Sequence, residues 1–144
     1  VGECVQGTGP LFDAYCGNGN LSLVYLATRK VAGMDISEPT IAAVAEIGGD
    51  YAVGDEPEMA VAIRGGAWGT IVLDPPRAGA KALVPALCAA KAEELVYVSC
   101  DPVALARDLK GLIAGGWRVA RVIGLDLFPN TAHMETVVRL VRGE

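Results

Sequence analysis

Short apolar runs alternate with stretches of helical periodicity along the whole chain. This alternation is typical of parallel strands joined by crossover helices, which cover both faces of the sheet they connect. We therefore predict an α/β fold built on a mostly parallel sheet of seven strands. The length of 144 residues suits one hydrophobic core, and no repeat or linker divides the sequence, so we expect one domain over residues 1–144.

The same pattern predicts where the elements lie. The strands are expected near 10–15, 31–35, 51–53, 69–73, 94–99, 117–124 and 134–141, and the helices near 20–29, 38–47, 56–64, 80–91 and 102–114. The last helix has the clearest signals, because Asp101 is a good N-cap residue, Pro102 suits the first helical position and Gly115 follows the apolar stripe. No helical pattern separates the last two strands, which predicts a hairpin.

Composition and charge exclude several classes of protein. Charge or glycine interrupts every apolar stretch before the ~18 residues that a membrane span needs, and the N-terminus lacks the basic start of a secretion signal. A net charge of −5 does not suggest a free-standing binder of polyanions. The cysteines show no paired short spacing, which argues against a metal site or a disulfide framework and favours a reducing cytoplasm.

A glycine-rich turn, DAYCGNGN at residues 13–20, follows the first expected strand. Gly17 and Gly19 would let the backbone pass close to a ligand, and the helix expected at 20–29 would offer free amide donors at its start. Many strand-to-helix turns contain glycine for packing reasons alone. This turn by itself therefore leaves a structural and a ligand-binding interpretation open.

Carboxylates follow the next two expected strands. Asp35 ends the second strand, where it can accept hydrogen bonds from two ribose hydroxyls, and Asp55 follows the third, within reach of an adenine ring. Each aspartate alone is more often a helix cap or a turn residue. The glycine-rich turn and both aspartates, each directly after a strand, together favour a cofactor that contains a nucleoside.

Two successive prolines stiffen the segment IVLDPPRAGA at residues 71–80, at the end of the fourth expected strand. Such stiffness would hold the Asp74 carboxylate and the Arg77 guanidinium beside a substrate. A rigid turn with a solvated arginine is the alternative.

Cys100 directly follows the strand expected at 94–99 and precedes a capped helix, whose partial positive charge should lower the pKa of the thiol. Glu135 lies at the start of the last strand among apolar neighbours, which would raise its pKa as a general base requires; an ordinary edge-strand charge is the alternative. His133, the only histidine, would either pair with Cys100 or serve as a hydrogen-bonded structural residue.

Four motifs in this order, YCGNGN, DPPRAG, VSCDP and FPNTAHME, resemble the catalytic domain of the S-adenosylmethionine-dependent RNA uracil-5-methyltransferases. These enzymes form 5-methyluridine in tRNA and ribosomal RNA, and the resemblance extends from about Phe12 to Arg142. It implies the Rossmann-like class I methyltransferase fold with an antiparallel C-terminal hairpin, S-adenosylmethionine as cofactor, an RNA substrate, no metal and a cytoplasmic enzyme.

The resemblance also implies roles for particular residues. Cys100 matches the nucleophile that adds to carbon 6 of uracil, and Glu135 matches the base that removes the proton from carbon 5. Arg77 and His133 are candidates for contacts with the RNA. The expected cofactor residues, from the resemblance and the strand-end pattern together, are Tyr15, Gly17, Gly19, Asn20, Asp35, Asp55 and Asp74.

The sequence departs from the family in three ways. Asp101 replaces the asparagine that usually follows the nucleophile, and its negative charge should raise the pKa of the thiol and disfavour a nearby phosphate. The stretch between Asp35 and Asp55 is short and lacks an asparagine-rich segment. The chain also begins without methionine and without the family's upstream RNA-binding region, so we expect a processed protein or a piece of a longer one.

Two other functions remain open from the residues alone. The first is a remnant that binds a cofactor or RNA without catalysis, and the second is a thiol hydrolase that uses Cys100 and His133. An amino-group methyltransferase is less favoured, because its motif typically opens with Asn-Pro-Pro instead of Asp-Pro-Pro.

Overall fold

A computed structural model of the chain describes residues 1–127, 129–131 and 133–143. Every strand in this part of the chain begins and ends within one residue of its expected position. None of its helices is long and apolar enough to cross a lipid bilayer. The strands are β1 (Leu11–Ala14), β2 (Val31–Asp35), β3 (Asp50–Val53), β4 (Thr70–Leu73), β5 (Glu94–Ser99), β6 (Trp117–Leu125) and β7 (Glu135–Arg142). The helices are α1 (Glu38–Ala45), α2 (Glu56–Gly65), α3 (Val84–Ala89) and α4 (Pro102–Ala114), with the 3-10 turns η1 (Leu23–Tyr25) and η2 (Lys81–Leu83).

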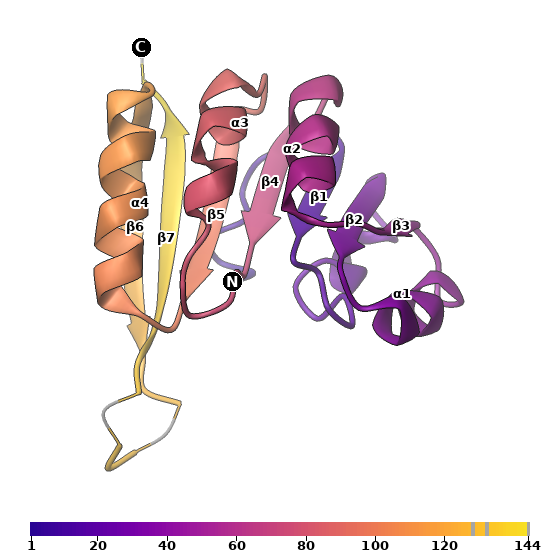
Figure 1. Cartoon of the computed structure of the whole chain (residues 1–144), viewed down its shortest axis with the longest axis horizontal. Helices are drawn as coiled ribbons and strands as arrows, with labels where there is room; N and C mark the ends of the chain where they lie inside the picture. The colour runs from indigo at the N-terminus through magenta and orange to yellow at the C-terminus, as the bar shows by residue number, and fades with distance from the viewer. Residues whose placement is uncertain (128, 132, 144) are drawn as a thin grey trace.

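The strands form one sheet in the order β3-β2-β1-β4-β5-β7-β6 (Figure 1). Strands β1 to β5 are parallel, whereas β7 lies antiparallel between β5 and β6. The predicted fold, a mostly parallel sheet of seven strands that ends in an antiparallel hairpin, is confirmed. The strand order reverses between β1 and β4, which is where open α/β sheets bind their ligands.

Side chains of the central strands alternate between two apolar layers. Ile71 and Leu95 face α2, α3 and α4, whereas their neighbours Val72 and Val96 face α1 and the N-terminal segment. Figure 1 shows α2, α3 and α4 side by side over one face of the sheet. Because both faces are covered, the central strands are apolar almost throughout, as the sequence indicated.

The prediction of a helix at residues 20–29 is wrong. This segment contains only the short 3-10 turn η1, with hydrogen-bonded turns on either side. The buried Ser22 hydroxyl donates to Asp13 on β1 over 2.5 Å and lies 2.8 Å from the Tyr51 hydroxyl on β3. These bonds hold the segment flat against the sheet, and a regular helix would carry Ser22 away from both partners.

The single helix expected at residues 80–91 is divided into η2 and α3. Pro85 lies in the first turn of α3 and has no backbone N–H, so it cannot continue a hydrogen-bond ladder from the preceding turn. Val84 instead donates its N–H to Lys81 and ends η2, and α3 starts at the same residue.

Replacing Ile63 by alanine should destabilise the protein. Ile63 on α2 is completely buried, and removal of such a side chain from a packed core costs about 2–5 kcal/mol. Val61 on the same helix is 64% exposed, so Val61→Ala should change the free energy of unfolding by less than about 0.5 kcal/mol. Urea unfolding followed by circular dichroism measures both, and equal losses would contradict the assignment of the buried face.

Candidate active site

A cavity of about 580 Å³ opens at the carboxyl ends of the central strands, beside the point where the strand order reverses. Its volume lies within the range of about 300–1,000 Å³ that is common for small-molecule sites. The wall is apolar except for four carboxylates and one phenol. The lining residues are Tyr15, Asp35, Ile36, Asp55, Glu56, Pro57, Met59, Asp74 and Pro76.

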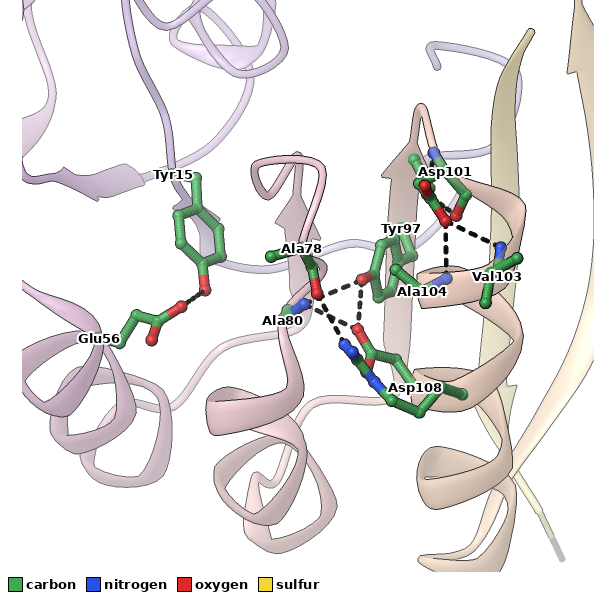
Figure 2. Close-up of polar contacts among 11 residues, drawn as sticks. Tyr15, Glu56, Ala78, Ala80, Tyr97, Asp101, Val103, Ala104 and Asp108 are labelled. Atoms are coloured by element: carbon green, nitrogen blue, oxygen red, sulfur yellow. Dashed lines mark hydrogen bonds and ion pairs between the residues drawn. The ribbon is translucent and has the colours of Figure 1, made fainter. Parts of the chain in front are cut away.

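The glycine-rich turn contributes Tyr15 to this wall. Tyr15 has a φ of 59°, which is unusual for a residue with a side chain. Its hydroxyl donates to the Glu56 carboxylate at the start of α2 over 2.6 Å (Figure 2). Burial and then the adjacent Glu56 raise the pKa of Tyr15, so the phenol stays protonated and remains a donor.

The two glycines of the turn have different roles. Gly19 has a φ of 73°, and a side chain there would come within 2.8 Å of Leu23 and Val44, so this glycine is needed for packing. Gly17 has a φ of 50° and open space where a side chain would start. Gly17 therefore leaves the backbone open on this side, and Asn20 lies exposed further along the turn.

The predicted carboxylates lie along the cavity. Asp35 accepts hydrogen bonds of 3.0 Å from the backbone N–H groups of Gly17 and Ser37, and so joins the glycine-rich turn to the end of β2. Asp55 caps α2 in a reciprocal pair with Glu58, and it also lines the cavity. Burial, with a smaller effect of the Glu135 charge, raises the pKa of Asp74 to about 6.

A further carboxylate, Asp13, is buried beneath the turn. One of its oxygens accepts the Ser22 hydroxyl, and in the described part of the chain its Oδ1 has no hydrogen-bond partner. Burial in this layer raises the pKa of Asp13 to about 7, and the charges of Asp74 and Asp35 add to this increase. Half-satisfied carboxylates of this kind are expensive to bury and are frequent at functional sites.

Cys100 lies exposed directly after β5 and before the first residue of α4. The Asp101 side chain caps the helix by accepting 2.9 Å hydrogen bonds from the N–H groups of Val103 and Ala104. Arg77 approaches the same carboxylate at 3.4 Å, so the segment after β4 is joined to the start of α4. The hydrogen bond from the Ala104 N–H lowers the pKa of Asp101 most, and the contact with Arg77 lowers it further.

The register of β5 and β7 brings the ends of both strands together. Ser99 pairs with Thr136 in the antiparallel ladder, so Cys100 and Glu135 are the next residues at the same edge of the sheet. Glu135 is half-buried, and its charge acts on Asp74 at the end of the neighbouring strand β4. The candidate nucleophile, the candidate base and the cavity therefore share one edge.

His133 lies exposed in the segment that joins β6 to β7. Within the described ranges no hydrogen bond joins its side chain to Cys100, and its backbone N–H donates to the Thr131 hydroxyl. Its pairing with Cys100 and its contact with RNA therefore stay predictions.

The sequence reasoning missed two polar residues around the site, Asp13 and Glu56, and a third, Asp108, further along α4. Asp13 and Asp108 each interrupt an apolar pattern, in β1 and on the buried face of α4, and this interruption is a usable signal. Glu56 gave no such signal, because its partner Tyr15 is 41 positions away in the sequence.

Solved methyltransferases have the same fold. The magnesium protoporphyrin IX methyltransferase of Synechocystis, solved with bound S-adenosylmethionine, is 19% identical with a TM-score of 0.70 over 92% of this chain and 69% of its own. The tRNA (uracil-54, C5)-methyltransferase of Pyrococcus abyssi, solved with S-adenosyl-L-homocysteine, is 32% identical with a TM-score of 0.84. That match covers 96% of this chain and 36% of the Pyrococcus chain. The fold is thus that of the class I methyltransferases.

The sequence comparisons define the class further. The profile of the tRNA (uracil-5-)-methyltransferase family matches residues 60–143. The 23S rRNA (uracil(1939)-C(5))-methyltransferase RlmD of Chromohalobacter salexigens is 37% identical over 95% of this chain, and an uncharacterised RNA methyltransferase of Bacillus cereus is 39% identical over 97%. The chain belongs to the tRNA (uracil-5-)-methyltransferase family. It spans 30% and 33% of the lengths of these two relatives.

The buried Asp13 should make stability depend on pH. Its pKa rises from 3.8 to about 7 on folding, so the folded state holds the proton more tightly than the unfolded chain. The free energy of unfolding should therefore be greatest below the lower value and fall as the pH rises through the upper one. A difference of one in pKa between the folded and unfolded states corresponds to about 1.4 kcal/mol.

Asp13→Asn should remove most of this dependence of the free energy of unfolding on pH, measured by urea unfolding from acid to neutral pH. The smaller contribution of Asp74 should remain. Asp50, whose side chain is 70% exposed and pairs with Lys30, provides the control. A slope that persists in Asp13→Asn and disappears in Asp50→Asn would contradict the interpretation.

Proposed function

We propose that the chain is the catalytic part of an enzyme that transfers a methyl group from S-adenosylmethionine to carbon 5 of a uridine in tRNA or ribosomal RNA. The register of β5 and β7 supports this proposal most, because it gives Cys100 and Glu135 a common edge beside an acidic cavity. Membership of the family and the activity of the Pyrococcus and Chromohalobacter relatives point to the same chemistry.

The donor set of the cavity fits the cofactor. S-adenosylmethionine supplies the methyl group on a positively charged sulfonium, and its amino group is also cationic, so a cavity with four carboxylates suits its charge. Asp35 stands at the end of β2, where this class of fold binds ribose hydroxyls, and Ile36, Pro57 and Met59 offer apolar surface to an adenine ring. Gly17 leaves the backbone open beside them.

Cys100 begins the reaction. Carbon 5 of uracil is a weak nucleophile, so the Cys100 thiolate adds to carbon 6, and the electron pair of the ring's 5,6 double bond moves to give an enolate. S-adenosylmethionine held in the cavity would supply the methyl group to carbon 5 of this enolate, with a neutral thioether as the leaving group. The thiol must reach the face of the ring, so the base has to leave any stack to enter the site.

Glu135 completes the reaction. Its carboxylate removes the proton from carbon 5, the 5,6 double bond forms again, and the Cys100 thiolate is expelled. A base must therefore lie on the same edge as the nucleophile, and the ladder between β5 and β7 supports this arrangement. Asp74 lines the cavity, and the Glu135 charge acts on it, which supports a position of Glu135 close to the cavity.

RNA that contains 5-fluorouridine should form a covalent adduct with the protein in the presence of S-adenosylmethionine, because fluorine on carbon 5 cannot leave as a proton. Cys100→Ala should abolish the adduct on a denaturing gel. Cys88, a half-buried free thiol on α3, provides the control, and Cys88→Ala should react like the wild type.

The reaction is run in parallel on the chain and on a chimaera in which the chain replaces the matching third of the Chromohalobacter relative, with binding of S-adenosylhomocysteine as the check for folding. An adduct that persists in Cys100→Ala would show that Cys100 is not the nucleophile. A folded chimaera that binds the cofactor product but forms no adduct would favour the non-catalytic remnant and overturn the proposal.

Glu135→Gln should separate the two halves of the reaction on ordinary uridine RNA. The glutamine cannot accept the carbon 5 proton, so the methylated adduct should accumulate and release of product should slow by about 10²–10⁴-fold. Mass spectrometry of the protein–RNA species checks this by the added methyl group. Free product formed at the wild-type rate would show that another group is the base.

A further inference from the structure

A cluster of three side chains, two of them buried, holds the segment that follows Asp74 and Arg77. We call Tyr97 on β5 together with Arg107 and Asp108 on α4 the α4 latch. Figure 2 shows Tyr97 and Asp108 turned toward Ala78 and Ala80, in the loop between β4 and η2. None of these residues lines the cofactor cavity, so the latch lies outside the site described above.

The contacts of the latch are directional. The Tyr97 hydroxyl and the Ala80 N–H both donate to Asp108 Oδ2, over 2.6 and 2.7 Å. Arg107 donates to Asp108 Oδ1 and, through Nη2, to the Ala78 carbonyl over 2.8 Å. Two backbone groups of the loop are thereby fixed to one ion pair, in which the Asp108 carboxylate is buried and the Arg107 side chain is exposed.

The burial of the latch makes this arrangement specific. Asp108 is 1% exposed and Tyr97 is fully buried, so neither has water as an alternative partner. Gly79 between the two bound backbone groups has a φ of 82°, and a side chain there would come 2.6 Å from Asp108 Oδ2. The buried Asp108 carboxylate needs all of its hydrogen bonds, and these are satisfied in only one position of the loop.

The helix that carries the latch also begins at the candidate nucleophile. Cys100 and Asp101 stand immediately before α4, and Asp108 lies two turns further along the same helix. Arg77 adds a second tie at 3.4 Å to Asp101. One helix therefore connects the residue next to Cys100 with the loop that follows Asp74.

We propose that the α4 latch positions the wall formed by Asp74 and Pro76 against Cys100, so that the gap between the cofactor cavity and the thiol matches the thickness of a pyrimidine ring. This inference rests on the proposed function. Tyr97 and Asp108 touch neither the ring nor the cofactor, and they act through the loop they hold. An error of about 1 Å in such a gap can cost about 10²-fold in rate.

A second buried cluster of the same type provides a control. Glu94, which is 2% exposed, accepts hydrogen bonds from Arg139, Thr70 and the backbone of Gly7. It lies at the first residue of β5, the end of the sheet opposite to Cys100. Loss of this cluster should reduce stability without changing the spacing at the site.

The test compares Asp108→Asn and Tyr97→Phe with Glu94→Gln in the adduct-forming protein, the chain or the chimaera. At saturating RNA and cofactor, and well below each unfolding temperature, both latch variants should form the 5-fluorouridine adduct about tenfold or more slowly than the wild type. Their dissociation constants for S-adenosylhomocysteine should change much less than the rate. Glu94→Gln should lower the unfolding temperature and keep the wild-type rate.

Gly79→Ala tests the latch without removing any of its groups. The added methyl group should push the loop away from Asp108 and slow adduct formation as Asp108→Asn does. Gly116 has a similar φ of 93° but open space around it, so Gly116→Ala reproduces the backbone strain alone and should react at the wild-type rate.

The outcomes separate the two proposals. A wild-type protein that forms no adduct overturns the proposed function, and the positioning role falls with it. A wild type that reacts while Asp108→Asn, Tyr97→Phe and Gly79→Ala react equally fast overturns the latch alone. If Glu94→Gln slows adduct formation as much as Asp108→Asn does, the effect of the latch variants comes from lost stability alone, and the inference is also overturned.

Discussion

The ladder between β5 and β7 is the constraint on which the site depends. β7 is antiparallel to β5, so the start of β7 lies beside the end of β5, and Glu135 reaches an edge of the sheet that is otherwise made of strand ends. A shift of the register by one residue would turn Glu135 toward the opposite face of the sheet. The buried Val137, Val138 and Leu140 fix this register by their alternation between the two layers.

Negative charge is concentrated at this edge at a cost to folding. Asp13 and Asp74 are more easily protonated than free aspartates, because burial penalises their charged forms and neighbouring carboxylates repel them. A chain selected for stability alone would replace such groups by apolar ones. A cationic ligand in the adjacent cavity would offset this repulsion, which gives the carboxylates a physical reason to be there.

The sequence predicted the strands well, because buried parallel strands are short apolar runs and nothing local competes with them. It failed at 20–29, where a buried bond from Ser22 to Asp13 decides the conformation, and at 80–91, where Pro85 restarts the helix. Cys100 and Asp74 were each predicted directly after a strand, and the ends of parallel strands meet at one edge of the sheet. The pairing of Tyr15 with Glu56 depends on tertiary geometry alone.

The charge at Asp101 illustrates how the fold modifies a local expectation. Beside Cys100 an aspartate should disfavour both a thiolate and a phosphate more than the family's usual asparagine does. In the structure its carboxylate faces two helix N–H groups and the Arg77 guanidinium, so positive partners surround the added charge. Arg77 comes from the loop that the α4 latch holds. The distance between the Arg77 guanidinium and the Asp101 carboxylate beside Cys100 therefore depends on the position of that loop. The contacts that offset the charge of Asp101 therefore depend on the position of this loop.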